Sequence, residues 1–298
     1  MIRLTNVRKK FGARLAVNDL SFTVPAGEIF GLLGHNGAGK STTFGMLLGQ
    51  IYPSAGEAFI RGVSVQQDRQ RALRGVGAIF EEPAFHDYLS GWDNLRILTS
   101  YTARLPEEEL REAVRFTGLE NRIHDPVRVY SHGMRQRLAL AQALLPRPEL
   151  ILLDEPAEGL DPEGIHEMRQ LILRLNREHG MTVVLSSHLL AEVEQLCDRV
   201  AILNQGRLIF KGHWNELTAA ATQGHRLDVD DWEKAEVVIK SLGASRLTDD
   251  TIALAPDGDM ADLVAALVTA GVRVRAVEPV RRNLEEIYLN AISDASRS

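Results

Sequence analysis

The sequence predicts an α/β fold with a largely parallel sheet, followed by a second and smaller α+β unit. Apolar runs of strand length alternate with segments of helical periodicity in the first 60 residues and again between 150 and 210. A stretch with helical periodicity alone, about 84–146, separates these two parts. Beyond residue 223 the order is strand, helix, strand, strand, helix, strand, which is the order of a small ferredoxin-like module.

The elements of the first unit follow from these periodicities. Strands are predicted at 2–7, 20–24, 28–33, 57–60, 76–80, 150–153, 181–187, 199–204 and 207–210. Helices are predicted at 41–48, 92–103, 106–117, 133–145, 162–178 and 189–196. Pro106 suits the first turn of its helix, and Gly180 ends the helix that begins at Pro162. This alternation predicts parallel strands joined by right-handed crossovers.

The second unit carries no catalytic constellation. Its predicted strands are 226–229, 245–248, 252–254 and 272–277, and its helices are 232–241 and 261–270. A last helix is expected at 283–289. We therefore expect domains at 1–217, with a helical subdomain at about 84–146, and at 223–298, the second with a regulatory, dimer-supporting or partner-binding role.

Composition places the chain among ordinary globular proteins. Of its 298 residues 45% are hydrophobic and 25% charged, and 40 acidic against 34 basic side chains give a net charge of −6. That balance gives no support for a nucleic-acid partner. The single cysteine, Cys197, excludes an internal disulfide. No stretch approaches the roughly 20 apolar residues that cross a bilayer, and residues 1–10 are unlike a signal peptide, so we expect a cytoplasmic protein.

One motif indicates a nucleotide phosphate site. Residues 34–42, GHNGAGKST, fit the G-x-x-x-x-G-K-[ST] loop between a buried strand and a helix. Such a loop holds phosphate oxygens on backbone N–H groups, its lysine reaches the β- and γ-phosphates, and its serine binds Mg²⁺. A glycine-rich turn with a stray lysine is the alternative. The predicted phosphate-binding residues are Gly34, His35, Asn36, Gly37, Ala38, Gly39, Lys40, Ser41 and Thr42.

Two further patterns narrow the choice among phosphate-loop proteins. Asp154 ends the buried strand at 150–153, where a carboxylate reaches the Mg²⁺ of the loop, and Glu155 follows it as a candidate base for water. Ser131 and Gly133 stand at the start of another helix, which offers a second anion site. A second anion site in one nucleotide-binding unit makes sense if it serves the nucleotide of another subunit.

With these motifs in order, the chain resembles the ATP-binding subunit of an ABC transporter over about residues 1–215. The five motifs are GHNGAGKST at 34–42, YSHGM at 130–134, LILLDEP at 150–156, EGLD at 158–161 and SSH at 186–188. The resemblance implies a RecA-like P-loop NTPase core with a helical subdomain. The tail and the stretch 77–95 resemble the bacterial branch that exports drugs, lantibiotics or polysaccharides.

The resemblance also implies roles for single residues. Two copies close head to tail, and the signature residues Ser131, His132, Gly133 and Met134 complete the partner's ATP site. Glu155 and His188 handle the attacking water, and Asp161 crosses the dimer interface. Phe11 stacks on adenine, with a core phenylalanine as the alternative. Glu81 stands where the family has a glutamine, and it is a third candidate ligand for Mg²⁺ beside Ser41 and Asp154.

The implied function is ATP hydrolysis that drives a separate membrane permease, with export favoured over import. The partners are a second copy or a paralogous ATP-binding subunit, and the permease holds the chain at the inner face of the membrane. A soluble, non-transport ABC ATPase is the alternative. The DNA-repair members need long coiled-coil insertions, and none fits between Lys40 and Ser131. The ribosome-acting members carry two phosphate loops in one chain, whereas this chain has one.

Overall fold

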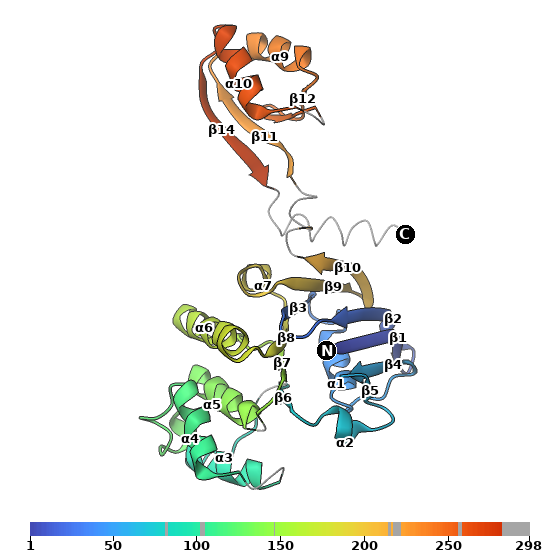
Figure 1. Ribbon diagram of the computed structural model, residues 1–298, viewed down its shortest axis with the longest axis vertical. Helices are drawn as coiled ribbons and strands as arrows, with labels where there is room; N and C mark the ends of the chain where they lie inside the picture. The colour runs from blue at the N-terminus through green and yellow to red at the C-terminus, as the bar shows by residue number, and fades with distance from the viewer. Residues whose placement is uncertain are drawn as a thin grey trace. The chain divides into compact units, whose positions relative to one another are not determined.

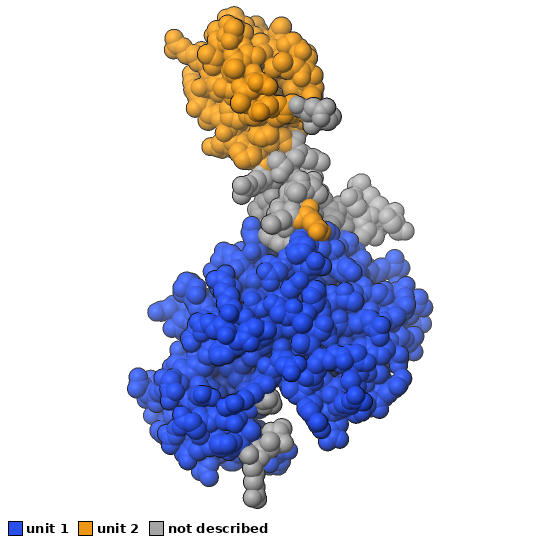
Figure 2. All heavy atoms as spheres, viewed as in Figure 1, with its two compact units in different colours: residues 1–214 blue, residues 215–298 orange. Residues whose placement is uncertain are grey.

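A computed structural model describes residues 1–80, 83–101, 105–145, 147–213, 216, 222–255 and 258–281. The chain divides into two compact units, Met1–Trp214 and Asn215–Ser298 (Figure 2). The domain boundary predicted from the sequence lies a few residues later, between 217 and 223. Along the described residues, no helix is both long and apolar enough to span a membrane.

A six-stranded sheet forms the centre of the first unit (Figure 1). Its strand order is β10-β9-β3-β8-β7-β6, and every neighbouring pair is parallel except β9 and β10. The strands are β3 (Ile29–Leu33), β6 (Val76–Ile79), β7 (Leu150–Asp154), β8 (Thr182–Ser187), β9 (Arg199–Asn204) and β10 (Arg207–His213). This architecture confirms the predicted α/β class.

Both faces of this sheet are covered, which explains why its strands read as continuous apolar runs. All residues of β3, β7 and β8 are buried. On one face pack α5 (His132–Leu144), α6 (Pro162–His179) and α7 (Leu190–Leu196) (Figure 1). The other face packs on α1 (Lys40–Leu47) and a second sheet, through a core that includes Phe30, Phe44 and Leu152.

The second sheet is antiparallel and has the order β2-β1-β4-β5. Its strands are β1 (Ile2–Phe11), β2 (Arg14–Val24), β4 (Ala55–Ile60) and β5 (Val63–Ser64), and the short α2 (Arg69–Ala72) follows. The prediction at 20–24 covered only the second half of β2. The alternation is broken because Asn6 and Asp19 have positive φ of 45° and 58°, and the register with β1 shifts beside Asn6.

The helical subdomain contains α3 (Gly91–Ser100), α4 (Glu107–Phe116), the short 3₁₀ helix η1 (Val127–Val129) and the first part of α5. These elements share a core that includes Leu95, Leu110 and Leu138. Hydroxyl caps set two of the helix starts, since Ser90 Oγ accepts from Asp93 N–H at 3.1 Å and Ser131 Oγ from Met134 N–H at 3.2 Å. Pro106 is the N-cap of α4 and does not lie in its first turn.

The second unit has the order β11-α9-β12-β13-α10-β14 and an antiparallel sheet ordered β12-β13-β11-β14, the ferredoxin-like arrangement. Its elements are β11 (Thr222–Val229), α9 (Trp232–Ser241), β12 (Ser245–Arg246), β13 (Thr251–Ala253), α10 (Met260–Thr269) and β14 (Val274–Arg281). Val272 is not in the last strand as predicted, because its N–H closes the end of α10 on Leu267 O at 3.0 Å. The predicted helix at 283–289 lies outside the described residues.

Candidate nucleotide site

The predicted site residues come from the ends of neighbouring parallel strands. The phosphate loop follows β3, Glu155 follows β7, and His188 follows β8, which lies between those two strands in the sheet. Parallel neighbours end at the same edge, so these side chains meet there. β6 also ends at this edge, with Ile79, but Glu81 lies outside the described residues.

The phosphate loop runs from the end of β3 to the first residue of α1 and depends on glycine for its shape. Gly39, the N-cap of α1, has φ of 108°, and a Cβ there would lie 2.7 Å from the carbonyl oxygen of Ala16. Thr43 Oγ1 donates to the Gly39 carbonyl at 2.8 Å. No acidic residue occupies the first turn of α1, so the positive end of the helix dipole is left available to an anion.

Lys40 is held in place by oxygen atoms. Its side chain is 5% exposed, and Nζ donates to the carbonyls of Gly34 at 2.5 Å and His35 at 3.4 Å. Nζ also lies 3.0 Å from Glu155 Oε1, a largely buried ion pair. A buried ammonium group needs such partners because it has lost its hydration. Lys40 is therefore fixed beside the loop, with the Glu155 carboxylate as its charged partner.

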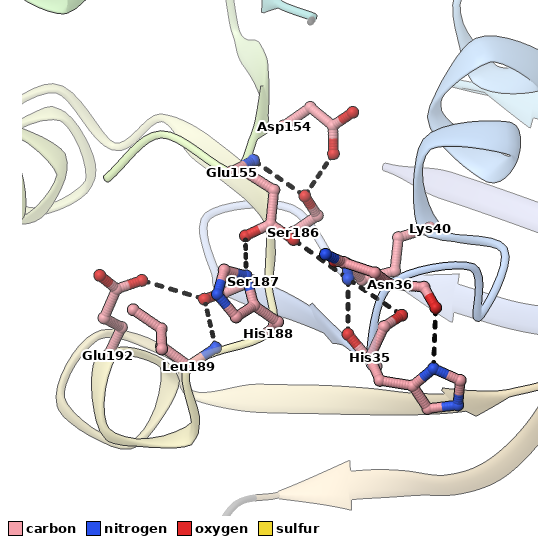
Figure 3. Close-up of polar contacts among 11 residues, drawn as sticks. His35, Asn36, Lys40, Asp154, Glu155, Ser186, Ser187, His188, Leu189 and Glu192 are labelled. Atoms are coloured by element: carbon pink, nitrogen blue, oxygen red, sulfur yellow. Dashed lines mark hydrogen bonds and ion pairs between the residues drawn. The ribbon is translucent and has the colours of Figure 1, made fainter. Parts of the chain in front are cut away.

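Glu155 lies between Lys40 and His188 (Figure 3). Its Oε2 is 2.9 Å from His188 Nδ1, and since a carboxylate oxygen only accepts, Nδ1 carries the proton. The Glu155 backbone has φ of 48°, and its N–H donates to Ser186 Oγ at 2.9 Å. A non-glycine residue in this left-handed region costs about 1–3 kcal/mol, a strain found often at functional sites. The strained backbone position is therefore that of Glu155, the residue whose carboxylate the sequence predicts to be the catalytic base.

Asp154 has the properties of a cation ligand. Its carboxylate is almost fully buried and accepts a hydrogen bond from Ser186 Oγ. Burial raises the pKa of Asp154, and the hydroxyls of Ser186 and Ser41 oppose that rise. A buried carboxylate and an adjacent hydroxyl form an oxygen donor set that suits a hard divalent cation. Among the described residues no three His, Cys, Asp or Glu side chains form a metal cluster.

Ser187, the residue before His188, makes a polar contact with Glu192 that was not predicted from the sequence. Ser187 Oγ donates to Glu192 Oε2 at 3.0 Å and accepts from Leu189 N–H at 2.9 Å (Figure 3). Glu192 is buried in the first turn of α7, and burial raises its pKa. A signal for it exists in the sequence, because Glu192 shares the apolar stripe of Val193 and Leu196.

A cavity of about 360 Å³ opens over the phosphate loop. Phe11, at the end of β1, lines it with its ring 49% exposed, beside the loop and Glu155. Arg14 also lines it and lies near Gly37, although no motif in the sequence points to this arginine. The structure thus gathers Phe11, the loop, Ser41 and Glu155 around one cavity.

Of the four signature residues, His132 lines a second cavity together with Asp154 and Glu155, and the other three lie elsewhere. Ser131 is the exposed N-cap of α5, and neither it nor Gly133 lines the cavity over the loop. The Met134 side chain is buried in the core of the helical subdomain. Asp161 is the N-cap of α6 and accepts from Gly164 N–H at 2.8 Å. These residues do not complete the site of their own chain.

Comparison with known proteins identifies the family. A family model described as ABC transporter matches residues 17–158. The chain is 38% identical over 289 residues to an uncharacterized ABC transporter ATP-binding protein of Bacillus subtilis, a match that covers 97% of this chain and 95% of that protein. The chain belongs to the ABC transporter ATP-binding proteins. It is an ATP-binding and ATP-hydrolysing subunit, as the sequence predicted.

Other ABC relatives and solved cassettes agree. The chain is 38% identical to a bacitracin transport ATP-binding protein of Bacillus licheniformis, over 80% of this chain and 78% of that one. It is 36% identical to a lantibiotic transport ATP-binding protein of Streptococcus pyogenes, and the match covers 72% of this chain and 92% of that protein. An ATP-binding subunit of an ABC transporter superposes with a TM-score of 0.66 and 30% identity, over 74% and 92%. A dimeric cassette in a post-hydrolysis state with ADP and Pi superposes with a TM-score of 0.64 and 25% sequence identity. That match covers 72% of this chain and 98% of the cassette.

Proposed function

We propose that this ABC ATPase powers an exporter by closing on a second copy around ATP and hydrolysing it with Glu155. The observation that carries the proposal is the position of the Glu155 carboxylate, which contacts Lys40 with one oxygen and His188 with the other. It stands at the mouth of the cavity over the phosphate loop. A carboxylate placed there can accept a proton from a water that attacks the γ-phosphate.

The contacts of each site residue support a role in ATP binding or in hydrolysis. The phosphates of ATP compete with Glu155 for Lys40, and the transfer of Lys40 to phosphate leaves Oε1 of Glu155 free to accept a proton from water. His188 holds Oε2, so the carboxylate keeps its orientation during that exchange. Phe11 is a half-exposed residue that lines the cavity, and an adenine can stack on its ring. The loop amides and the N-terminus of α1 hold the anionic oxygens.

Mg²⁺ fits the remaining donors. Ser41 and Asp154 would hold it, and their hydroxyl and carboxylate oxygens are the ligands that Mg²⁺ takes beside nucleotide phosphates. When bound, the ion supplies positive charge that offsets the charge developing on the transferred phosphoryl group. Glu81 is a further candidate ligand that lies outside the described residues.

The second half of each site comes from a partner copy. Ser131 and the Gly133 amide lie at the exposed N-terminus of α5, which runs for 13 residues and carries no acidic residue in its first turn. That is a favourable anion site, and it faces no phosphate of its own chain. A dimeric solved cassette of the same fold supports the pairing of two copies. Homodimer and paralogous heterodimer are both compatible with this chain, because it contains every part of the site.

A permease is the other proposed partner, and it would hold the chain at the inner face of the membrane. Two relatives are transport proteins for bacitracin and a lantibiotic, which favours export of a peptide-like or drug-like compound. The segment 85–98 is the expected docking surface, and in it Tyr88 is 87% exposed. Trp92 is only partly exposed, because it packs on the core of the helical subdomain.

Replacement of Glu155 tests the mechanism. Glu155→Gln keeps the size and a hydrogen-bond acceptor but cannot take a proton, so kcat should fall at least about 100-fold. ATP-bound dimers should accumulate, which size-exclusion chromatography with ATP and Mg²⁺ would detect. Glu120→Gln, an exposed replacement outside the site, is the control. Near-normal hydrolysis by the Glu155 variant would remove Glu155 as the base.

Copurification tests the transport role. The chain should copurify with the membrane protein of an adjacent gene, and in proteoliposomes its ATPase rate should rise with the transported compound. A chain that hydrolyses ATP alone at a rate no membrane partner alters would instead be a soluble ABC ATPase.

A further inference from the structure

The imidazole of His132 joins the start of α5 to the segment that follows Glu155. His132 Nε2 lies 2.9 Å from the carbonyl oxygen of Glu158. A carbonyl oxygen only accepts hydrogen bonds, so Nε2 carries a proton and donates it. In the sequence His132 is a residue of the signature, and the structure shows its imidazole hydrogen-bonded to another motif of the same chain.

The ring also packs on Gly159. Gly159 has φ of 74°, and a Cβ built there would lie 3.3 Å from His132 Nε2 and 3.5 Å from Cδ2. The absence of a side chain at 159 lets the ring approach the backbone closely. His132 therefore contacts the segment 158–159 through both a hydrogen bond and van der Waals packing.

This segment leads directly to Glu155. Glu158 N–H donates to the Glu155 carbonyl at 3.1 Å, which closes a turn that begins at the strained φ of Glu155. A shift of Glu158 thus changes the backbone that carries the Glu155 carboxylate. Between α5 and the two carboxylates lies a cavity of about 360 Å³, lined by Asp154, Glu155 and His132 among others. His132 and Glu158, the two residues of this hydrogen bond, both line the cavity.

We propose that His132 is a positioning residue that couples the signature end of α5 to Glu155 of its own chain. An anion bound at Ser131 and Gly133 fixes the first turn of α5. Through its hydrogen bond to Glu158, His132 then restricts the backbone of the turn at 155–158. Each site of the dimer then reports its occupancy to the other site. This inference rests on the proposed function for its dimer and for the role of Glu155.

Two amide replacements of His132 distinguish loss of the hydrogen bond to Glu158 from loss of the imidazole, because both are polar and only one can form the bond. His132→Gln can place an N–H close to the position of Nε2, whereas His132→Asn is shorter and cannot reach the Glu158 carbonyl. α5 should stay folded in both, because the core of the helical subdomain and an Arg137–Glu167 ion pair at 3.5 Å hold it. His166→Asn, an exposed histidine on α6, is the control for loss of an imidazole.

Steady-state kinetics give the first readout. We expect cooperative ATP hydrolysis by the wild type and His132→Gln, while in His132→Asn the Hill coefficient falls toward 1 and kcat drops about 10-fold. ATP affinity of the monomer should stay the same, since His132 does not line the cavity over the loop. Non-cooperative hydrolysis by the wild type, or equal defects in the two variants, would overturn the proposal.

Hydrogen exchange gives a second readout that needs no hydrolysis. In the nucleotide-free chain, His132→Asn should speed exchange at the amides of Glu158 and Leu160 about 5-fold, the scale of one lost hydrogen bond, and His132→Gln should not. Unchanged exchange in His132→Asn would reject the link. If the wild type fails to hydrolyse ATP, the proposed function falls, while the exchange data still decide whether His132 holds the segment.

Discussion

At the scale of single residues, the site is organised around buried charge. The Lys40 and Glu155 side chains are 5% and 16% exposed, so each depends on the other for compensation. His188 adds a hydrogen bond to Glu155, and this leaves the carboxylate oriented whichever partner Lys40 takes. In the mechanism we propose, ATP binding replaces the Lys40–Glu155 contact with a Lys40–phosphate contact, so Glu155 can accept a proton only when nucleotide is bound.

Glu192 allows a test of buried charge by pH. Burial raises its folded-state pKa above the ordinary value of about 4.3. Its contribution to stability is therefore fully present below that ordinary pKa and is lost as pH rises through the folded pKa. Glu192→Gln lacks the charge and keeps an acceptor for Ser187. The Tm of Glu192→Gln relative to the wild type should therefore rise as the pH increases from the ordinary glutamate pKa through the raised folded-state pKa of Glu192.

The matched control for this prediction is Glu194→Gln, because Glu194 is exposed on the same helix. Its Tm difference from the wild type should change little with pH. Thermal unfolding across the pH series measures both variants. A pH-independent difference for Glu192→Gln would mean that the carboxylate is not held at a cost in the folded protein.

At the scale of elements, the phosphate loop with α1 and the signature with α5 act as separate halves of a site. A mixing experiment tests this. Gly133→Asp puts a negative charge into the anion site at the start of α5, and the fold should tolerate it because a Cβ at 133 meets only Leu160 at 3.6 Å. Mixed with Lys40→Met, it should yield heterodimers with one intact site. Activity should exceed the sum of the single variants, up to about a quarter of wild type for random pairing.

Gly133→Ala is the matched control, since it adds the Cβ without the charge and should retain most of the ATPase activity. ATPase assays over a range of mixing ratios measure the recovery. No recovery at any ratio, with both variants folded, would count against a site shared between two chains.

The elements also show what the sequence could and could not predict. β3, β7 and β8 were predicted closely because both faces are buried and their sequences are apolar without a break. The chemistry at their ends followed from the parallel order, so Lys40, Glu155 and His188 could be expected to meet. β2 was predicted only in part because local irregularity at Asn6 and Asp19 breaks its alternation. Arg14 in the cavity and the His132–Glu158 bond arise from tertiary contacts, which no local pattern encodes.

At the scale of the whole molecule, each unit has a hydrophobic core of its own. The first unit contains large cores around its two sheets and its helical subdomain. The second unit has a separate core that includes Leu227, Ile239 and Leu263. All of the predicted site residues that the structure describes belong to the first unit. Catalysis and folding of that unit should therefore not depend on the second.

Truncation after residue 217 tests this independence. The shortened chain keeps every strand of the six-stranded sheet and ends beyond β10, so it should fold and bind ATP with a Kd within about 2-fold of the full chain, a difference below 0.5 kcal/mol. Calorimetry of the full chain should show one more transition than the truncated form, because separate cores unfold separately. Loss of ATP binding by a folded truncated chain would show that the second unit contributes to the site. If binding persists but ATP-dependent dimers no longer form, the second unit supports the pairing of two copies and has no part in the chemistry.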